Sequence, residues 1–291
     1  MTSTYLDRLA ARSSAVGTVL CLGLDPDPDA LPDGFRRDVA GIEHFAALVL
    51  EAALPYAAAV KPNLAFYEAY GAPGIAALQR LRDSIPAAVP VVLDAKRGDI
   101  GTTAARQAVA LFDVLGADAV TVNPYLGGAA VGPLTERTDR FAYVLCRTSN
   151  DGAGELQGLR VAADPATGAP EETLHERVAR RVVGWGAGHT VGLVVGATAP
   201  AELAAIRAIA PGLPFLVPGI GAQGGAIEPV LADGPATGSP AGTRRGGGLL
   251  VNVSRGIAGA ATTSGTAGPR DPLERVEEAA REWAGRLPVL P

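Results

Sequence analysis

Eight short apolar segments alternate along this chain with longer segments whose apolar residues recur at helical spacing. Such alternation predicts βα units around a parallel sheet, because parallel strands are joined by crossover helices. The expected strands are residues 18–24, 57–61, 90–95, 119–122, 142–146, 191–195, 215–217 and 249–253. The expected helices are residues 5–12, 41–53, 73–83, 102–115, 172–185, 201–209, 226–231 and 272–286.

The number of βα units favours a closed (β/α)8 TIM barrel, an α/β fold in which residues 1–291 form a single domain. An open, doubly wound sheet is the alternative, but that fold normally carries a G-x-G-x-x-G fingerprint after its first strand. The first turn here reads Gly-Leu-Asp-Pro-Asp-Pro, so it has two prolines and lacks the fingerprint. We therefore expect the barrel, with its site at the carboxyl ends of the strands.

Two polar segments interrupt the alternation. Residues 233–248 read DGPATGSPAGTRRGGG, a Gly/Pro-rich insertion with no apolar side chain larger than alanine apart from its two prolines. This composition is typical of a mobile surface loop. A second polar stretch, residues 260–270, separates the last strand from the closing helix, for which Asp271 is the expected N-cap.

Charge and cysteine content exclude several classes of protein. The 30 acidic and 25 basic residues give a net charge of −5, and no Lys/Arg cluster is large enough for a nucleic-acid partner. No run approaches 18 consecutive apolar residues, so we expect no membrane-spanning helix. Cys21 and Cys146 cannot form a disulfide framework, and each lies in an apolar run, which indicates buried thiols in a cytoplasmic protein.

Charged residues end three consecutive strands. The third strand and its turn read Asp94-Ala-Lys96-Arg-Gly-Asp99, and residues two apart on a strand share a face, so Asp94 and Lys96 point the same way. The second strand ends on Lys61, directly before a proline, and the first runs into Asp25. Barrel enzymes keep catalytic groups at strand ends, although a salt bridge that only holds the rim would also explain Asp94 and Lys96.

Glycine-rich turns follow the seventh and eighth strands, with the sequences Pro218-Gly-Ile-Gly-Ala-Gln223-Gly-Gly and Ser254-Arg255-Gly256. Barrels often bind phosphate at this place, through loop amides and a helix N-terminus. Glycine lets backbone N–H groups approach the anion, and Arg255 can bind it with two hydrogen bonds. The two loops together predict a phosphate site, whereas ordinary tight turns beside a solvated arginine are the alternative.

In these motifs the chain resembles the orotidine 5′-phosphate decarboxylase family, in particular its longer bacterial branch. The resemblance covers residues 18–257 and rests on Leu24-Asp25, Lys61-Pro-Asn63, the run from Asp94 to Thr103, and the two glycine-rich turns. The Asp-x-Lys-x-x-Asp element is shared by a wider group of phosphate-handling barrels. Lys61 narrows the match, because related sugar-phosphate decarboxylases resemble one another in having a carboxylate and a metal there.

The resemblance implies an enzyme that decarboxylates orotidine 5′-phosphate to UMP in pyrimidine biosynthesis, with no cofactor and no metal. It implies a charged network of Lys61, Asp94, Lys96 and Asp99, in which Asp94 lies near the substrate carboxylate and Lys96 protonates C6. It further implies a homodimer with shared active sites, because Asp99 and Thr103 would reach into the neighbouring subunit. It implies that Asp25 and Lys61, with Asp99 and Thr103 of the neighbouring subunit, hold the ribose hydroxyls. It also implies that Ser149 contacts the pyrimidine and that Gln223, Arg255 and Gly256 bind the phosphate.

Two other hypotheses remain open. A metal-dependent sugar-phosphate lyase or decarboxylase could share the fold, but it would need a carboxylate where Lys61 stands. A protein that binds phosphoribosyl ligands without turnover is the other alternative, although binding alone does not require so many buried charges. His44, His175 and His189 have no partner spacing that indicates a metal or catalytic role.

Overall fold

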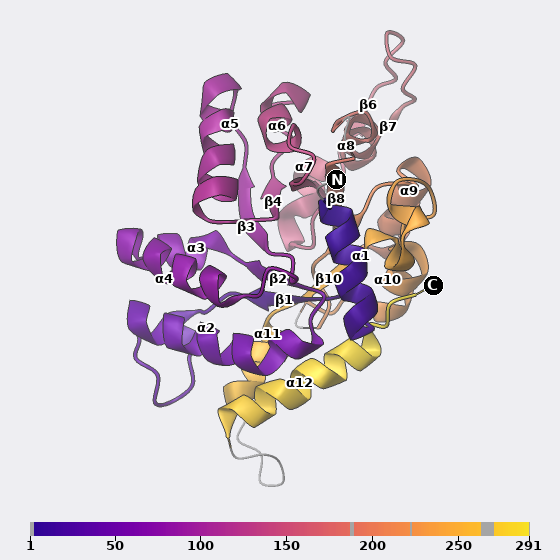
Figure 1. The fold of residues 1–291 in the computed structure, drawn as a ribbon. Coiled ribbons are helices and arrows are strands. Elements are labelled where there is room, and N and C mark those ends of the chain that lie inside the picture. Colours follow the sequence, from indigo (N-terminus) through magenta and orange to yellow (C-terminus); the bar gives the residue numbers. More distant parts are fainter. Residues whose placement is uncertain (1–2, 187–188, 222, 263–270, 291) are drawn as a thin grey trace.

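The computed structural model describes residues 3–186, 189–221, 223–262 and 271–290. At its centre lies an eight-stranded parallel sheet in the order β2-β1-β10-β9-β8-β5-β4-β3. Backbone pairs between Val60 and Val91 and between Asn63 and Asp94 join β2 to β3, so the two ends of this order meet. The sheet therefore closes into the predicted (β/α)8 barrel, with helices around the outside (Figure 1).

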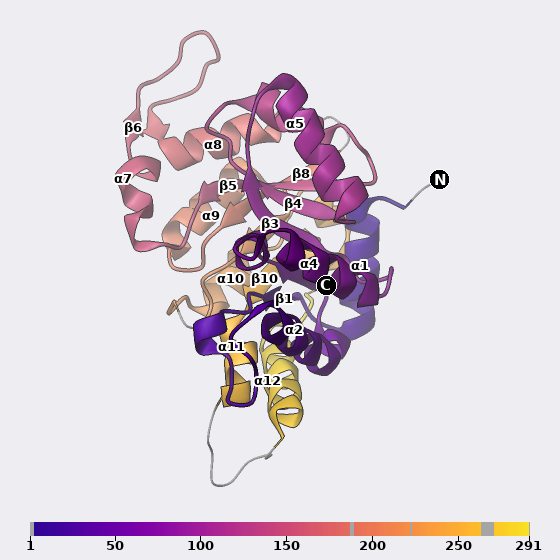
Figure 2. The same ribbon diagram turned by 90° about the vertical axis from the view of Figure 1, so that its left-hand side faces the viewer.

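All eight predicted strands are confirmed, and their ends lie within two residues of the predicted ends. The barrel strands are β1 (Leu20–Leu24), β2 (Ala59–Pro62), β3 (Val92–Arg97), β4 (Ala119–Val122), β5 (Phe141–Arg147), β8 (Val191–Val195), β9 (Phe215–Val217) and β10 (Leu250–Val253). A two-stranded hairpin that was not predicted, β6 (Arg160–Val161) and β7 (Glu172–Thr173), projects from the barrel after β5 (Figure 2).

The predicted helices are also present, and the second half of one of them is a π-helix. They are α1 (Tyr5–Val16), α2 (Val39–Ala53), α4 (Gly71–Ser84), α5 (Gly101–Ala108) with the π-helical η3 (Val109–Val114), α8 (Leu174–Val183), α9 (Pro200–Ile209), α10 (Ile227–Asp233) and α12 (Pro272–Arg286). Asp271 caps α12 as expected, by accepting a hydrogen bond from the backbone N–H of Leu273.

Four short α-helices within the described residues were not predicted: α3 (Leu64–Glu68), α6 (Gly128–Thr135), α7 (Gly154–Gln157) and α11 (Arg255–Ala258). α6 shows why periodicity misses such elements, because it contains Pro133 and two glycines and has little amphipathic character. Its position is set by packing, since a Cβ atom at Gly128 would lie 2.7 Å from Nε1 of Trp185. Tertiary contact, rather than local preference, places this helix.

Helix α1 closes the amino-terminal end of the barrel. Tyr5 and Leu9 are buried there, and the ring of Tyr5 stacks on Phe141 at the start of β5, with 4.8 Å between ring centroids. Arg8 pairs with the buried carboxylate of Asp118 at 2.9 Å. Because this end is filled by side chains, the barrel can be open only at the carboxyl ends of its strands.

Residues 233–248, which we expected to form a mobile surface loop, are in part buried beneath the barrel. The segment forms two short helical turns, η5 (Ala241–Thr243) and η6 (Arg245–Gly248), and Ala236 and Ala241 are buried in the cluster beneath the barrel that includes Tyr5. Because it precedes β10, it lies at the amino-terminal end, away from the glycine-rich turns. Small residues allow this burial, since a Cβ atom at Gly247 would lie 2.5 Å from the backbone nitrogen of Ala236.

The second polar stretch, residues 260–270, begins with the end of the turn η7 (Gly259–Thr262). Residues 263–270 lie outside the described part of the chain.

One described segment, Val39–Tyr56, is long and apolar enough to cross a membrane, with a mean hydropathy of 1.3. It combines α2 with the turn η2 (Leu54–Tyr56), and its inner residues Ile42, Phe45 and Val49 belong to the main core. α2 also packs alongside α12 on the outside of the barrel (Figures 1 and 2). We therefore interpret the segment as a core helix of the barrel.

Candidate active site

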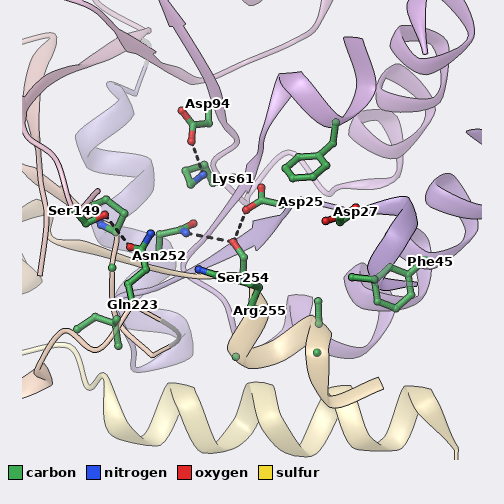
Figure 3. Close-up of a pocket in the computed structure, with 18 residues that line it drawn as sticks. Asp25, Asp27, Phe45, Lys61, Asp94, Ser149, Gln223, Asn252, Ser254 and Arg255 are labelled. Carbon is green, nitrogen blue, oxygen red and sulfur yellow. Dashed lines mark hydrogen bonds and ion pairs between the residues drawn. The ribbon is translucent and has the colours of Figure 1, made fainter. Parts of the chain in front are cut away.

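A cavity of about 320 Å³ opens at the carboxyl ends of the strands. Residues that follow or end several strands line it (Figure 3). They are Asp25 after β1, Lys61 on β2, Asp94 on β3, Ser149 after β5, Gly219 and Gln223 after β9, and Asn252, Ser254, Arg255 and Gly256 on and after β10. The barrel thus brings together residues that are more than 200 positions apart in the sequence.

The carboxylate of Asp94 lies between two ammonium groups. Its Oδ2 atom accepts a hydrogen bond from Nζ of Lys61 at 2.8 Å, and its Oδ1 atom accepts one from Nζ of Lys96 at 2.6 Å. The Lys61 side chain is 5% exposed and that of Asp94 12%, whereas that of Lys96 is 51% exposed. The centre is therefore a buried ion pair with a second, half-exposed lysine bound to the same carboxylate.

Burial and pairing act in opposite directions on this centre. Burial by itself would raise the pKa of Asp94, but the charges of Lys61 and Lys96 outweigh it and hold that pKa well below its usual range. For Lys61, burial would lower the pKa, yet the carboxylates of Asp94 and then Asp25 raise it overall. Asp94 and Lys61 are thus both ionised at neutral pH, which leaves fixed charges facing the cavity.

Lysine occurs nowhere else in this chain. Of the 25 basic residues, only Lys61 and Lys96 are lysines, and all the others are arginines. An arginine supplies a positive charge equally well but does not give up its proton in proteins. The use of lysine at this centre alone therefore indicates chemistry that needs a compact or proton-donating cation.

A second group of polar atoms gathers at the ends of β1 and β10. Ser254 donates to Oδ2 of Asp25 at 2.7 Å, and Nδ2 of Asn252 lies 3.4 Å from the Ser254 hydroxyl. Oδ1 of Asp25 and Oδ1 of Asn252 are buried and have no hydrogen-bond partner among the described residues. Buried acceptors without partners are uncommon, and two of them at one cavity suit the hydroxyl groups of a ligand.

The turns after β5 and β9 are joined across the cavity. The hydroxyl of Ser149 donates to Oε1 of Gln223 at 2.8 Å. Gly219 has a positive φ of 101°, and a Cβ atom there would lie 2.9 Å from Cβ of Ser149. Glycine is therefore required for this close approach.

Arg255 and Gly256 begin the short helix α11 at the edge of the same cavity. Helix α12, on the outside of the barrel, holds this turn in place, because Nε1 of Trp283 donates a hydrogen bond to the carbonyl oxygen of Gly256 at 3.1 Å. Trp283 also leaves no room for a side chain, since a Cβ atom at Gly256 would lie 2.9 Å from Nε1.

Three of the predicted site residues, Lys96, Asp99 and Thr103, are not among those that line this cavity. Lys96 joins the charged centre through its hydrogen bond to Asp94. Asp99 is in the turn after β3, where its Oδ1 atom accepts a hydrogen bond from the N–H of Ile100, and Thr103 is exposed on α5. Thr103 instead lines a separate hollow with Glu68 and Arg97. Within one chain, the structure therefore assembles the predicted network only as far as Lys61, Asp94 and Lys96.

Sequence analysis did not assign a role to Asn252 or to Thr121. Asn252 interrupts the apolar strand β10, and Thr121 interrupts β4, so each is a polar residue on a strand that is otherwise apolar. A polar residue within an apolar strand can be recognised from the sequence, but the sequence does not show which side chains it will contact. Thr121 contacts Asp94 and Lys96, and Asn252 contacts Ser254.

Comparisons with known proteins agree on one family. Residues 18–268 match the family model described as "Orotidine 5'-phosphate decarboxylase / HUMPS family". The orotidine 5′-phosphate decarboxylase of Herpetosiphon aurantiacus is 45% identical over 254 residues, which cover 87% of this chain and 88% of that protein. That of Thermomicrobium roseum is 43% identical over 289 residues, covering 97% and 98%. The solved structure of Leishmania donovani OMP decarboxylase is similar with a TM-score of 0.78 at 38% identity, covering 97% of this chain and 98% of that one.

Proposed function

Because this chain belongs to the orotidine 5′-phosphate decarboxylase family, we propose that its Lys61–Asp94–Lys96 centre removes CO2 from the substrate and protonates C6. The chain is a carboxy-lyase of pyrimidine biosynthesis that converts orotidine 5′-phosphate to UMP. The observation that carries the residue assignment is the position of Asp94, buried between the chain's two lysines.

The chemical problem is the charge left on the ring. When the bond from C6 to the carboxyl carbon breaks, CO2 leaves and the electron pair stays on C6, where it is not delocalised as in an ordinary enolate. A site can favour such a charge only with fixed positive groups aimed at that position. Lys96 supplies this charge and then transfers a proton from Nζ to C6, which completes UMP.

Asp94 acts on the bound substrate, whereas Lys96 acts on the charge that forms at C6. A substrate carboxylate placed beside this ionised group is repelled by it, and the repulsion is relieved as neutral CO2 forms. Lys61 keeps Asp94 ionised, because its ammonium group lies 2.8 Å from Oδ2 of that carboxylate. After proton transfer Lys96 is a neutral amine, and its 51% exposure allows it to regain a proton from water.

The other residues at the cavity hold the substrate. Asp25, which has an acceptor oxygen free for a ligand hydroxyl, binds the ribose. Ser149 recognises the pyrimidine, and its hydrogen bond to Gln223 couples that contact to the phosphate end. Gln223, Arg255 and Gly256 bind the phosphate, whose binding energy organises the loops around the reacting ring.

Activity is expected to be independent of metal ions. Lys61 supports this proposal, because an ammonium group next to Asp94 competes with a cation for the same carboxylate oxygens. The decrease in absorbance on conversion of orotidine 5′-phosphate, followed with and without EDTA, should give the same rate. Turnover that EDTA abolishes would favour the metal-dependent alternative, and a lack of turnover in both conditions would contradict the proposed residue roles.

We place this enzyme in the cytoplasm, where its thiols would remain reduced. Burial raises the pKa of the Cys21 thiol to about 12, so that thiol stays protonated, and Cys146 is also a buried free cysteine.

The active unit is proposed to be a homodimer with shared sites. Asp99 and Thr103, which lie outside the cavity of their own chain, would then enter the cavity of a second copy. Large apolar side chains support an interface here, since Ile100 is 66% exposed after β3 and Tyr125 is 84% exposed after the neighbouring strand β4. Exposed apolar residues of this size, close together, are typical of surfaces covered by a partner.

Mixing two inactive variants tests the shared site. Half of the dimers in an equal mixture of Lys96→Ala and Asp99→Ala subunits are heterodimers, and one of their two sites is intact, so about a quarter of wild-type activity is expected. Each variant alone supplies the control. If heterodimers form, as mass spectrometry can show, and activity stays at the level of the separate variants, the sites are not shared.

A further inference from the structure

Strand β3 leaves regular pairing with β4 at the catalytic residues. Leu93 pairs with Val120 and Arg97 pairs with Val122, so Thr121 is the one β4 residue opposite the three residues from Asp94 to Lys96. Within this bulge Lys96 has a φ of 46°, in the left-handed region that side-chain-bearing residues rarely adopt. Such a conformation persists only where the surroundings hold it.

The hydroxyl of Thr121 forms hydrogen bonds with both Lys96 and Asp94. It accepts a hydrogen bond from the backbone N–H of Lys96 at 3.0 Å and donates one to Oδ1 of Asp94 at 2.8 Å. Thr121 is only 2% exposed, so water does not replace these contacts. Because the Lys96 N–H occupies the acceptor side of the oxygen, its single proton is directed at the carboxylate.

We propose that Thr121 is a positioning residue for proton transfer, which holds the Lys96 backbone and the Asp94 carboxylate in one fixed relation. The proposal rests on the roles given above to Lys96 and Asp94. Oδ1 of Asp94 receives both the Thr121 hydroxyl and Nζ of Lys96, so the hydroxyl fixes the acceptor toward which the ammonium group is drawn. Without it, the bulge loses its cross-strand anchor and Nζ loses a defined position relative to C6.

An isosteric substitution tests this role. Thr121→Val keeps the volume and removes the hydroxyl, and we expect kcat to fall about tenfold to a hundredfold, with KM and the Kd for UMP changed by less than about threefold. Thr121→Ser restores the hydroxyl and should recover kcat to within about threefold of wild type. A role in packing alone would instead make the serine variant, which lacks the methyl group, the worse of the two.

A buried threonine at the other end of the barrel is the matched control. Thr190 is 1% exposed and donates to the carbonyl oxygen of Thr135 at 2.6 Å, far from the cavity. Thr190→Val should lower the midpoint of thermal unfolding without lowering kcat. The proposal is overturned if Thr121→Val keeps kcat within about twofold of wild type, or if it weakens UMP binding as much as it lowers kcat.

A double variant separates this proposal from the assignment of Lys96. If Thr121 acts through Lys96, adding Thr121→Val to Lys96→Ala should not lower the residual activity further, whereas independent effects would multiply. A normal rate for Lys96→Ala alone would overturn the proposed proton donor. A full loss in Lys96→Ala together with multiplied losses in the double variant would overturn only the role of Thr121.

Discussion

Replacing Lys96 by alanine is expected to lower kcat by at least about four orders of magnitude, which corresponds to ~5.5 kcal/mol of transition-state stabilisation. In the proposed mechanism, the variant loses both the positive charge next to C6 and the proton that C6 receives. UMP should still bind, because the proposed ribose and phosphate contacts of this chain lie on β1, β9 and β10 and their turns. Steady-state rates with orotidine 5′-phosphate and the Kd for UMP measure the two effects separately.

Lys96→Arg distinguishes charge from proton transfer. Arginine keeps the cation, and the other basic residues of this chain show that arginine is readily used where only charge is needed. Because a guanidinium group does not release its proton, we expect Lys96→Arg to be nearly as inactive as Lys96→Ala. A loss of only about tenfold in the alanine variant, ~1.4 kcal/mol, would show that another group donates the proton.

Asp94→Asn is expected to lower kcat by about three orders of magnitude or more, because it removes the charge that pairs with both lysines and that is proposed to repel the substrate carboxylate. KM should not rise, because the variant removes a repulsion that weakens binding of the substrate. The variant also leaves Lys61 buried without a carboxylate at 2.8 Å, so the free energy of unfolding should fall by about 3–5 kcal/mol. Kinetics and denaturant unfolding measure the two consequences.

An exposed ion pair supplies the control for this variant. Asp113 pairs with Arg137 at 2.6 Å, but its side chain is 45% exposed, so Asp113→Asn should change the free energy of unfolding by less than about 1 kcal/mol and leave kcat unchanged. Near-normal kcat in Asp94→Asn would mean that the buried pair only holds the barrel rim.

The pH dependence of stability follows from the lowered pKa of Asp94. A carboxyl group whose pKa is lower in the folded than in the unfolded state stabilises the fold above its unfolded pKa of about 3.9. This contribution is lost as the pH falls from there towards the folded pKa. Between about pH 5 and pH 8 the Asp94 contribution should therefore be constant, and its protonation should not produce an acid limb in the rate profile.

The sequence alone determined the fold and the charged centre. The alternation of apolar and helical segments predicted all eight strands, because the period of apolar residues records which local face is buried. The position of Asp94, two residues before Lys96 on one strand, and of Lys61 at the end of the neighbouring strand was sufficient to bring the three charges together. The positions of the two glycine-rich turns, directly after β9 and β10, were likewise predicted from the local sequence.

Only the tertiary structure decided where the insertion lies and what surrounds the charges. Ala236 and Ala241 are buried through close backbone approach by small residues, which hydropathy does not register. The contacts of Thr121 with Lys96 and Asp94, and of Ser254 with Asp25, join segments that are distant in sequence. Periodicity describes each strand by itself, whereas a hydrogen bond between strands depends on register, on the bulge in β3 and on closure of the barrel.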